Sequence, residues 1–120
     1  MELKSSNYKA LKFVPSGAHV KGVFLTKTTI GGELSGFAGF EAGVNGKPLS
    51  VIWQADVVQV PKAAVVFAAG DALYVILATG VVTNVDDAGN NDRCGYAIEA
   101  ALSGDATAEI YWDTSLQATA

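Results

Sequence analysis

The sequence predicts a mainly β fold: a small β-barrel or sandwich of about seven short strands, with one short helix and an extended N-terminal arm. Thirteen glycines and three prolines divide the 120 residues into short segments. Those segments are rich in Val, Ile, Phe, Tyr and Thr, which strands favour. Half of the residues are apolar and only 17% are charged, a composition typical of one compact domain and not of a disordered chain.

The expected strands lie between the glycine and proline turns. They are residues 20–26, 34–40, 49–60, 72–78, 80–85, 94–102 and 106–112. Asn45-Gly46 gives the strongest hairpin signal, because a type I′ turn needs positive φ at both central residues and these two residue types tolerate it best. In the last strand, alternation places Ala108, Ile110 and Trp112 on one face, which we expect to belong to the core.

Residues 61–70 are expected to form the one short helix, or a turn. Pro61 suits the first turn of a helix and Gly70 suits a helix end. Two four-residue segments have similar sequences: residues 69–72 are Ala-Gly-Asp-Ala and residues 103–106 are Ser-Gly-Asp-Ala. We expect each to be a turn in which glycine supplies the unusual dihedral and the carboxylate of Asp71 or Asp105 caps the turn.

The first 15 residues are expected to form the extended arm, and residues 16–120 a single β-rich domain. Residues 1–27 contain five lysines and one acid, a charge of +4, whereas residues 28–120 hold three basic and eleven acidic side chains, a charge of −8. The segment has no arginine and the chain has a pI near 4.7, so we expect no nucleic-acid partner. A basic and apolar arm suits an acidic protein surface; a solvated strand with a frayed end is the alternative.

Residue types for catalysis are sparse, and we expect no enzyme activity, no cofactor and no metal. His19 has no nucleophile motif around it, and Cys94 lies in an apolar strand pattern typical of a buried thiol. The acidic loop 86–92 lacks the spacing of a calcium-binding EF-hand, so we expect a solvated turn. Sequence spacing does not pair any of the carboxylates weighed for a glycosidase, which are Glu41, Asp56, Glu99 and Glu109.

No segment has the length and composition of a membrane span. The longest apolar stretch, residues 72–82, is interrupted by Thr79 and Gly80 and is too short to cross a bilayer. The N-terminus lacks the apolar run of a secretory signal. We therefore expect no membrane partner and a soluble protein made inside a cell.

A carbohydrate-binding or adhesion β-sandwich is an alternative function, which would expose a row of aromatic side chains. The candidates for such a row are Trp53, Tyr74, Tyr96, Tyr111 and Trp112. For Trp53 the core is the default position, with a contact anchor as the alternative, because Trp contributes strongly to interfaces. A small hydrolase or isomerase is a weaker alternative, because no credible general base is present.

A series of short motifs resembles the tailed-phage capsid decoration, or capsid cement, proteins. They are Val-Val-Gln-Val-Pro-Lys-Ala at 57–63, Ala-Gly-Asp-Ala-Leu-Tyr at 69–74, Gly-Val-Val-Thr at 80–83, Gly-Tyr-Ala at 95–97 and Ala-Ala-Leu-Ser-Gly-Asp-Ala-Thr at 100–107. Upstream, Gly-Phe-Ala-Gly at 36–39 and Ala-Gly at 42–43 resemble a strand and a glycine turn of that family. The resemblance covers about residues 36–110, and Asp56 and Cys94 depart from the family pattern.

The resemblance implies a non-enzymatic protein that is synthesised in the host cytoplasm and binds the outer capsid surface of the virion. Its partner would be the lattice of major capsid protein subunits, which it would bridge as a homotrimer, stabilising the head. Oligomer contacts would also add buried area to a small domain without a disulfide. The capsid-contact candidates are the basic and apolar side chains of the arm, Lys4, Tyr8, Lys9, Leu11, Lys12, Phe13 and Val14.

Overall fold

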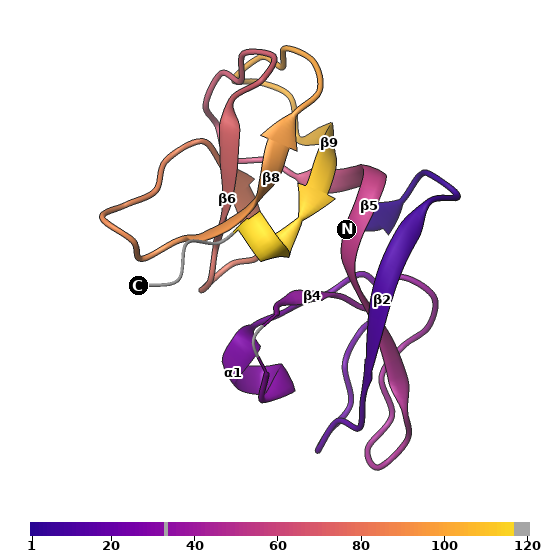
Figure 1. The fold of residues 1–120 in the computed structure, drawn as a ribbon. Coiled ribbons are helices and arrows are strands. Elements are labelled where there is room, and N and C mark those ends of the chain that lie inside the picture. The colour runs from indigo at the N-terminus through magenta and orange to yellow at the C-terminus, as the bar shows by residue number, and fades with distance from the viewer. Residues whose placement is uncertain (33, 117–120) are drawn as a thin grey trace.

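The computed structural model describes residues 1–32 and 34–116, and it is built around one branched antiparallel sheet (Figure 1). The strands are β1 (Glu2–Leu3), β2 (Tyr8–Phe13), β3 (Phe24–Leu25), β4 (Gly36–Phe37), β5 (Leu49–Pro61), β6 (Ala72–Ile76), β7 (Val81–Thr83), β8 (Asp92–Ala97) and β9 (Thr107–Asp113). The helical elements are α1 (Lys27–Ile30) and the 3-10 helix η1 (Thr114–Leu116). The predicted mainly β fold is confirmed; the last four residues of the expected domain lie outside the described residues.

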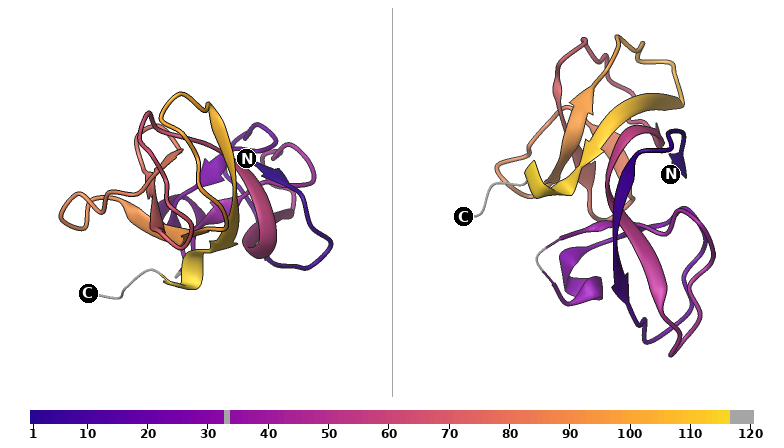
Figure 2. Two further views of the ribbon diagram at one scale, coloured as in Figure 1. Left: turned by 90° about the horizontal axis from the view of Figure 1, so that it is seen from above. Right: turned by 45° about the vertical axis from the view of Figure 1, so that its right-hand side comes forward.

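Strand β5 is the centre of the sheet, because it pairs along both of its edges. One edge carries β2 along residues 49–55 and β1 at residues 58–59. The other edge carries β4 at Ile52 and β9 from Gln54 to Pro61. Beyond β9 the order is β8, β6 and β7. Two lobes therefore share one continuous strand (Figure 2).

The C-terminal lobe (residues 57–116) is a curled, partly closed barrel. The strand at the end of the sheet order, β7, comes back beside the end of β5. There the backbone N–H of Ala63 donates a hydrogen bond of 2.8 Å to the carbonyl of Val82 in β7. The N-terminal lobe (residues 8–50) contains β2, β3, β4 and α1. This architecture agrees with the predicted small barrel or sandwich.

Two apolar clusters fill the lobes. The larger one surrounds Trp112, Phe37 and Phe67, all fully buried. The smaller one contains Leu25, Ala38, Leu49 and Val51, with Leu11, Phe13 and Ile30 packed against it. The face predicted for β9 is confirmed, since Ile110 and Trp112 are buried and Ala108 packs against the larger cluster.

The helix expected at residues 61–70 does not form. Pro61 is the last residue of β5, and the backbones of Phe67 and Ala101 exchange hydrogen bonds of 2.9 and 3.0 Å. This non-local pairing holds the segment open, so that only a turn remains near Gly70. The helix of the structure is instead α1, which Thr26 caps by accepting a hydrogen bond from the backbone N–H of Thr29 at 3.2 Å.

The strand predictions differ most in length. The expected strands at 49–60, 72–78 and 106–112 agree closely with β5, β6 and β9, but 20–26 and 34–40 contain only the two-residue strands β3 and β4. Asn45-Gly46 does form a turn, in which the N–H of Lys47 donates to the carbonyl of Val44 at 3.1 Å. Only Gly46 has a positive φ, of 76°, so the type I′ prediction is wrong.

The two turns of similar sequence, at residues 69–72 and 103–106, have the same side-chain hydrogen bond. The carboxylate of Asp71 accepts from the N–H of Ala68 at 2.8 Å, and that of Asp105 accepts from the N–H of Leu102 at 2.9 Å. The predicted Asp caps are confirmed. Of the two glycines only Gly70 has positive φ, so the expected glycine dihedral holds in one turn and not in the other.

Candidate functional site

Strand β2 forms an open edge of the sheet. Among the described residues it pairs only with β5, so its second edge carries backbone N–H and C=O groups that no other strand satisfies. Such an edge is a template for pairing with a further strand. The predicted arm is thus an extended segment that lies along β5 over residues 2–3 and 8–13.

The structure divides the arm candidates into surface and anchoring residues. Leu11 and Phe13 pack against the smaller apolar cluster. The exposed candidates are Lys4, Tyr8, Lys9, Lys12 and Val14. The Nζ atom of Lys4 lies 3.3 Å from a carboxylate oxygen of Glu2, an exposed ion pair of small energetic value.

An exposed aromatic pair lies at the start of β2. The rings of Tyr8 and Phe40 meet edge to face with centroids 5.1 Å apart, and these residues are 44% and 46% exposed. Nearby, the side-chain amide of Asn7 donates to the carboxylate of Asp56 at 3.1 Å. Phe40 was not among the predicted contact residues, because it was placed at the end of the expected strand 34–40, whereas β4 ends at Phe37 and leaves Phe40 in an exposed loop.

Trp53 lies outside both apolar clusters, so its default assignment to the core is wrong. Lys9 pairs with Gln54 whereas Ala10 pairs with Ile52, which leaves Trp53 as the extra residue of a β-bulge. The Nζ atom of Lys9 lies 5.6 Å from the centroid of the Trp53 ring, within the range of a cation–π contact. The bulge therefore adds a partly exposed ring beside β2.

Aromatic side chains also make contacts between adjacent strands of the C-terminal lobe. Tyr96 and Tyr111 stack with centroids 4.7 Å apart, and Tyr111 accepts a hydrogen bond of 2.8 Å from the side-chain amide of Gln54. On β6, the ring of Tyr74 lies 6.0 Å from the guanidinium carbon of Arg93. Trp112 is fully buried, so it cannot belong to an exposed row.

The comparison with protein families matches residues 6–112 to the family described as phage cement protein. The chain belongs to this family. Cement proteins are structural components of the phage capsid, and membership supports a capsid cement role with a location in the virion capsid. No curated protein and no solved structure matches the chain at a significant level.

The charge of this cement protein is separated between its lobes. Residues 8–50 contain five lysines and two glutamates, a charge of +3, whereas residues 57–116 contain two basic and eight acidic side chains, a charge of −6. Of the expected solvated turn at residues 86–92, residues 86–90 are exposed and project from the side of the C-terminal lobe (Figure 1), whereas Asn91 is buried and Asp92 begins β8, so the prediction is wrong for these last two residues. The uneven charge along the sequence therefore gives a basic N-terminal lobe and an acidic C-terminal lobe.

The structure brings two of the carboxylate candidates, Glu99 and Glu109, to one hollow, whereas His19, Cys94 and Glu41 lie elsewhere. Cys94 is fully buried, and burial raises the pKa of its thiol; His19 makes backbone hydrogen bonds of 3.0 and 2.7 Å with Gly43. Glu99 and Glu109 share a hollow with Asp105, and Glu41 lies in the other lobe. Within the described ranges no His, Cys, Asp and Glu side chains group as a metal site, and no helix there is long and apolar enough to cross a bilayer.

Proposed function

We propose that this cement protein, made in the host cytoplasm, binds the outer surface of the assembled head and bridges neighbouring major capsid protein subunits without catalysing a reaction. The single observation that carries the proposal is the open edge of β2 beside exposed lysines and aromatic rings. Extended segments of a partner bind such edges through main-chain hydrogen bonds. A capsid subunit would supply the strand.

The side chains around β2 suit an acidic partner surface. Lys9 and Lys12 attract carboxylates during approach, whereas Tyr8, Phe40 and Trp53 supply contact area that leaves water on binding. Leu11 and Phe13 stay in the smaller cluster and hold β2 in place. The acidic C-terminal lobe would then face outward and keep the particle soluble.

Stabilisation of the head follows from mass action. A protein that binds only the assembled lattice lowers the free energy of that state, so the shell must lose the bound copies before it opens. We further propose that the protein acts as a homotrimer, which would let one assembly contact several capsid subunits at once.

Charge reversal on β2 tests the capsid contact. Deleting residues 1–15 is a poor test, because it would remove a paired strand of β5 and uncover the smaller cluster. The variant Lys9→Glu/Lys12→Glu should instead fold normally and lose most of its binding to undecorated, expanded heads, as measured by co-sedimentation and cryo-electron microscopy. Lys27→Glu, on α1, is the matched control and should bind like the wild type. Equal binding by all three proteins would reject β2 as the contact.

Carbohydrate binding is a second candidate function, because Tyr96 and Tyr111 stack beside Gln54 on neighbouring strands. Exposed rings with adjacent hydrogen-bonding groups suit the apolar and polar faces of a sugar. A glycan array tests this function. Binding that is lost in Tyr96→Ala and kept in Lys9→Glu/Lys12→Glu would support it, and an array without signal would reject it.

A further inference from the structure

An acidic hollow lies at the far end of the C-terminal lobe. Its lining residues are Gln59, Glu99, Ala100, Ala101, Asp105, Thr107, Ala108 and Glu109. The loops that carry Glu99 and Asp105 end the lobe on the side away from the N-terminal lobe (Figure 1). The Glu99, Asp105 and Glu109 side chains are exposed, so three carboxylates border one depression.

Exposed aliphatic residues flank the lining of this hollow along the chain. Ile98 and Leu102 flank the lining residues 99–101 and are 45% and 70% exposed. Val66, 58% exposed, precedes Phe67, whose backbone pairs with Ala101. We call this surface, Val66, Ile98, Leu102 and the three carboxylates, the acidic tip.

Lys62, a buried cation of the same lobe, forms no ion pair with the acidic tip among the described residues. The ammonium group of Lys62 donates to the carbonyls of Ala63 and Val65 and lies 5.0 Å from the centroid of the Phe67 ring. Lys62 is therefore engaged with the main chain beneath the surface. A cation supplied from outside would complete the tip.

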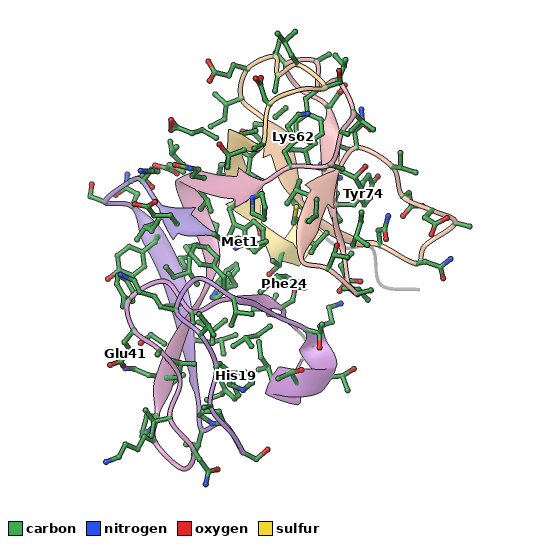
Figure 3. The ribbon with its side chains drawn as sticks, turned by 180° about the vertical axis from the view of Figure 1, so that it is seen from behind. Met1, His19, Phe24, Glu41, Lys62 and Tyr74 are labelled. Atoms are coloured by element: carbon green, nitrogen blue, oxygen red, sulfur yellow. The ribbon has the colours of Figure 1, made fainter. Side chains whose placement is uncertain are left out.

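A second exposed aliphatic surface lies where the two lobes meet. Val23 and Leu77, 37% and 41% exposed, line one hollow together with Met1, Phe24 and Pro61. Figure 3 shows Met1 and Phe24 below Lys62 in this view of the molecule.

The turn that precedes Val23 adds a charge to this surface. The N–H of Val23 donates to the carbonyl of Val20 at 3.1 Å, which presents Val20, 75% exposed, and the exposed Lys21 at the turn. None of the described residues lining the adjacent hollow is acidic. We call Val20, Lys21, Val23 and Leu77 the Lys21 patch.

We propose that the acidic tip of one copy binds the Lys21 patch of a second copy. The two surfaces are complementary, because each exposes three aliphatic side chains and they carry opposite charge. The ammonium group of Lys21 would enter the hollow between the carboxylates, and the aliphatic side chains around it would exclude water. The inference rests on the proposed function in one respect, since it names the contact that would build the homotrimer.

The geometry of this contact is head to tail. Two different surfaces of the chain meet, so every copy keeps one free tip and one free patch until a ring closes or a filament grows. A closed ring of three copies would occupy every tip and every patch. The contact also leaves the open edge of β2 free, because none of its residues belongs to the tip or to the patch.

Charge exchange between the two surfaces tests the contact in free protein, without heads. Lys21→Glu reverses the patch, and Glu99→Lys/Glu109→Lys reverses the tip. In low salt, sedimentation should show wild-type assemblies, and each reversal should raise the dissociation constant of self-association by about tenfold or more. The combined Lys21→Glu/Glu99→Lys/Glu109→Lys variant should recover most of the affinity. Lys47→Glu, outside both surfaces, is the matched control and should assemble like the wild type.

The outcomes separate this proposal from capsid binding. Monomeric wild type at all concentrations, reversals without effect, or a combined variant no better than the single reversals would each overturn the contact. Because heads are absent, a failure of head binding does not alter this result. Reversal variants that still assemble but no longer bind heads would assign both surfaces to the capsid protein, and would also overturn it.

Discussion

The indole N–H of Trp112 donates a hydrogen bond of 3.1 Å to the main-chain carbonyl of Ile52 inside the core. The same ring meets Phe24 and Phe37 edge to face, with centroids 6.1 and 5.5 Å away. Strand β9 is thereby fastened to β5 and to the β3–β4 pair. Trp112 thus joins the two lobes at their point of contact.

Replacing this residue should weaken the whole fold. Trp112→Phe removes the donor to Ile52 and leaves a small cavity, so we expect the free energy of unfolding to fall by about 2 kcal/mol in urea titrations. Trp53→Phe is the matched control, because Trp53 is only partly buried, and it should cost less. Equal losses in the two variants would contradict the assigned role.

Gly95 should not tolerate a side chain. Its φ is 152°, and a Cβ atom there would overlap the carbonyl oxygen of Tyr111. We expect Gly95→Ala to destabilise the protein by about 3 kcal/mol, measured as a shift of the thermal midpoint. Gly104→Ala has open space around the added atom and should change stability by less than about 0.5 kcal/mol.

Cys94 should be inert in the folded protein. Burial raises the pKa of its thiol, so the neutral form persists at alkaline pH and thiol reagents should label it only when the chain unfolds. The unfolded chain releases this proton above about pH 8.5, and the free energy of unfolding should therefore fall as pH rises further.

Cys94→Val isolates that ionisation. The variant lacks the thiol. Between about pH 9 and 10 its free energy of unfolding should therefore fall less than that of the wild type, and the difference should be up to about 1.4 kcal/mol per pH unit. Rapid labelling of native wild type at neutral pH would contradict the burial of Cys94.

The two Asp-capped turns should contribute similar stability. Asp71→Ala and Asp105→Ala each remove an acceptor for one backbone N–H, and each should cost about 1 kcal/mol. The turns adjoin the same Phe67–Ala101 pair, so the double variant should deviate from additivity. Chemical denaturation of the four proteins measures this coupling.

Local signals predicted the strands in which residue preference and pairing agree. The β-branched run of β5 and the alternation of β9 gave those strands closely, and Gly-Asp pairs gave the capped turns. The short strands β3 and β4 were predicted too long, because only residues 24–25 and 36–37 pair in strand geometry, although Gly22 and Val23 still exchange backbone hydrogen bonds with Ala38 beyond them. Their length depends on distant residues and not on their own sequence.

The helix and the site depended on contacts that the sequence does not display. Residues 61–70 read as a helix, but pairing with Ala101 and Val82 overrides that local preference. Helix α1 has its cap signals, Thr26 and Gly31, around an interior of Thr and Ile that disfavours helix. Likewise, the bulge that exposes Trp53 arises from a register shift between β2 and β5, and the pattern of apolar and polar residues does not predict this shift.

The continuity of β5 through both lobes has a mechanical consequence. A pull along β2, as a swelling shell would exert at the proposed contact, acts parallel to the ladder that joins β2 to β5. Loading in this direction strains many main-chain hydrogen bonds together instead of opening them one after another. A force applied at the open edge would therefore be distributed over the hydrogen bonds between β2 and β5, which would have to break together.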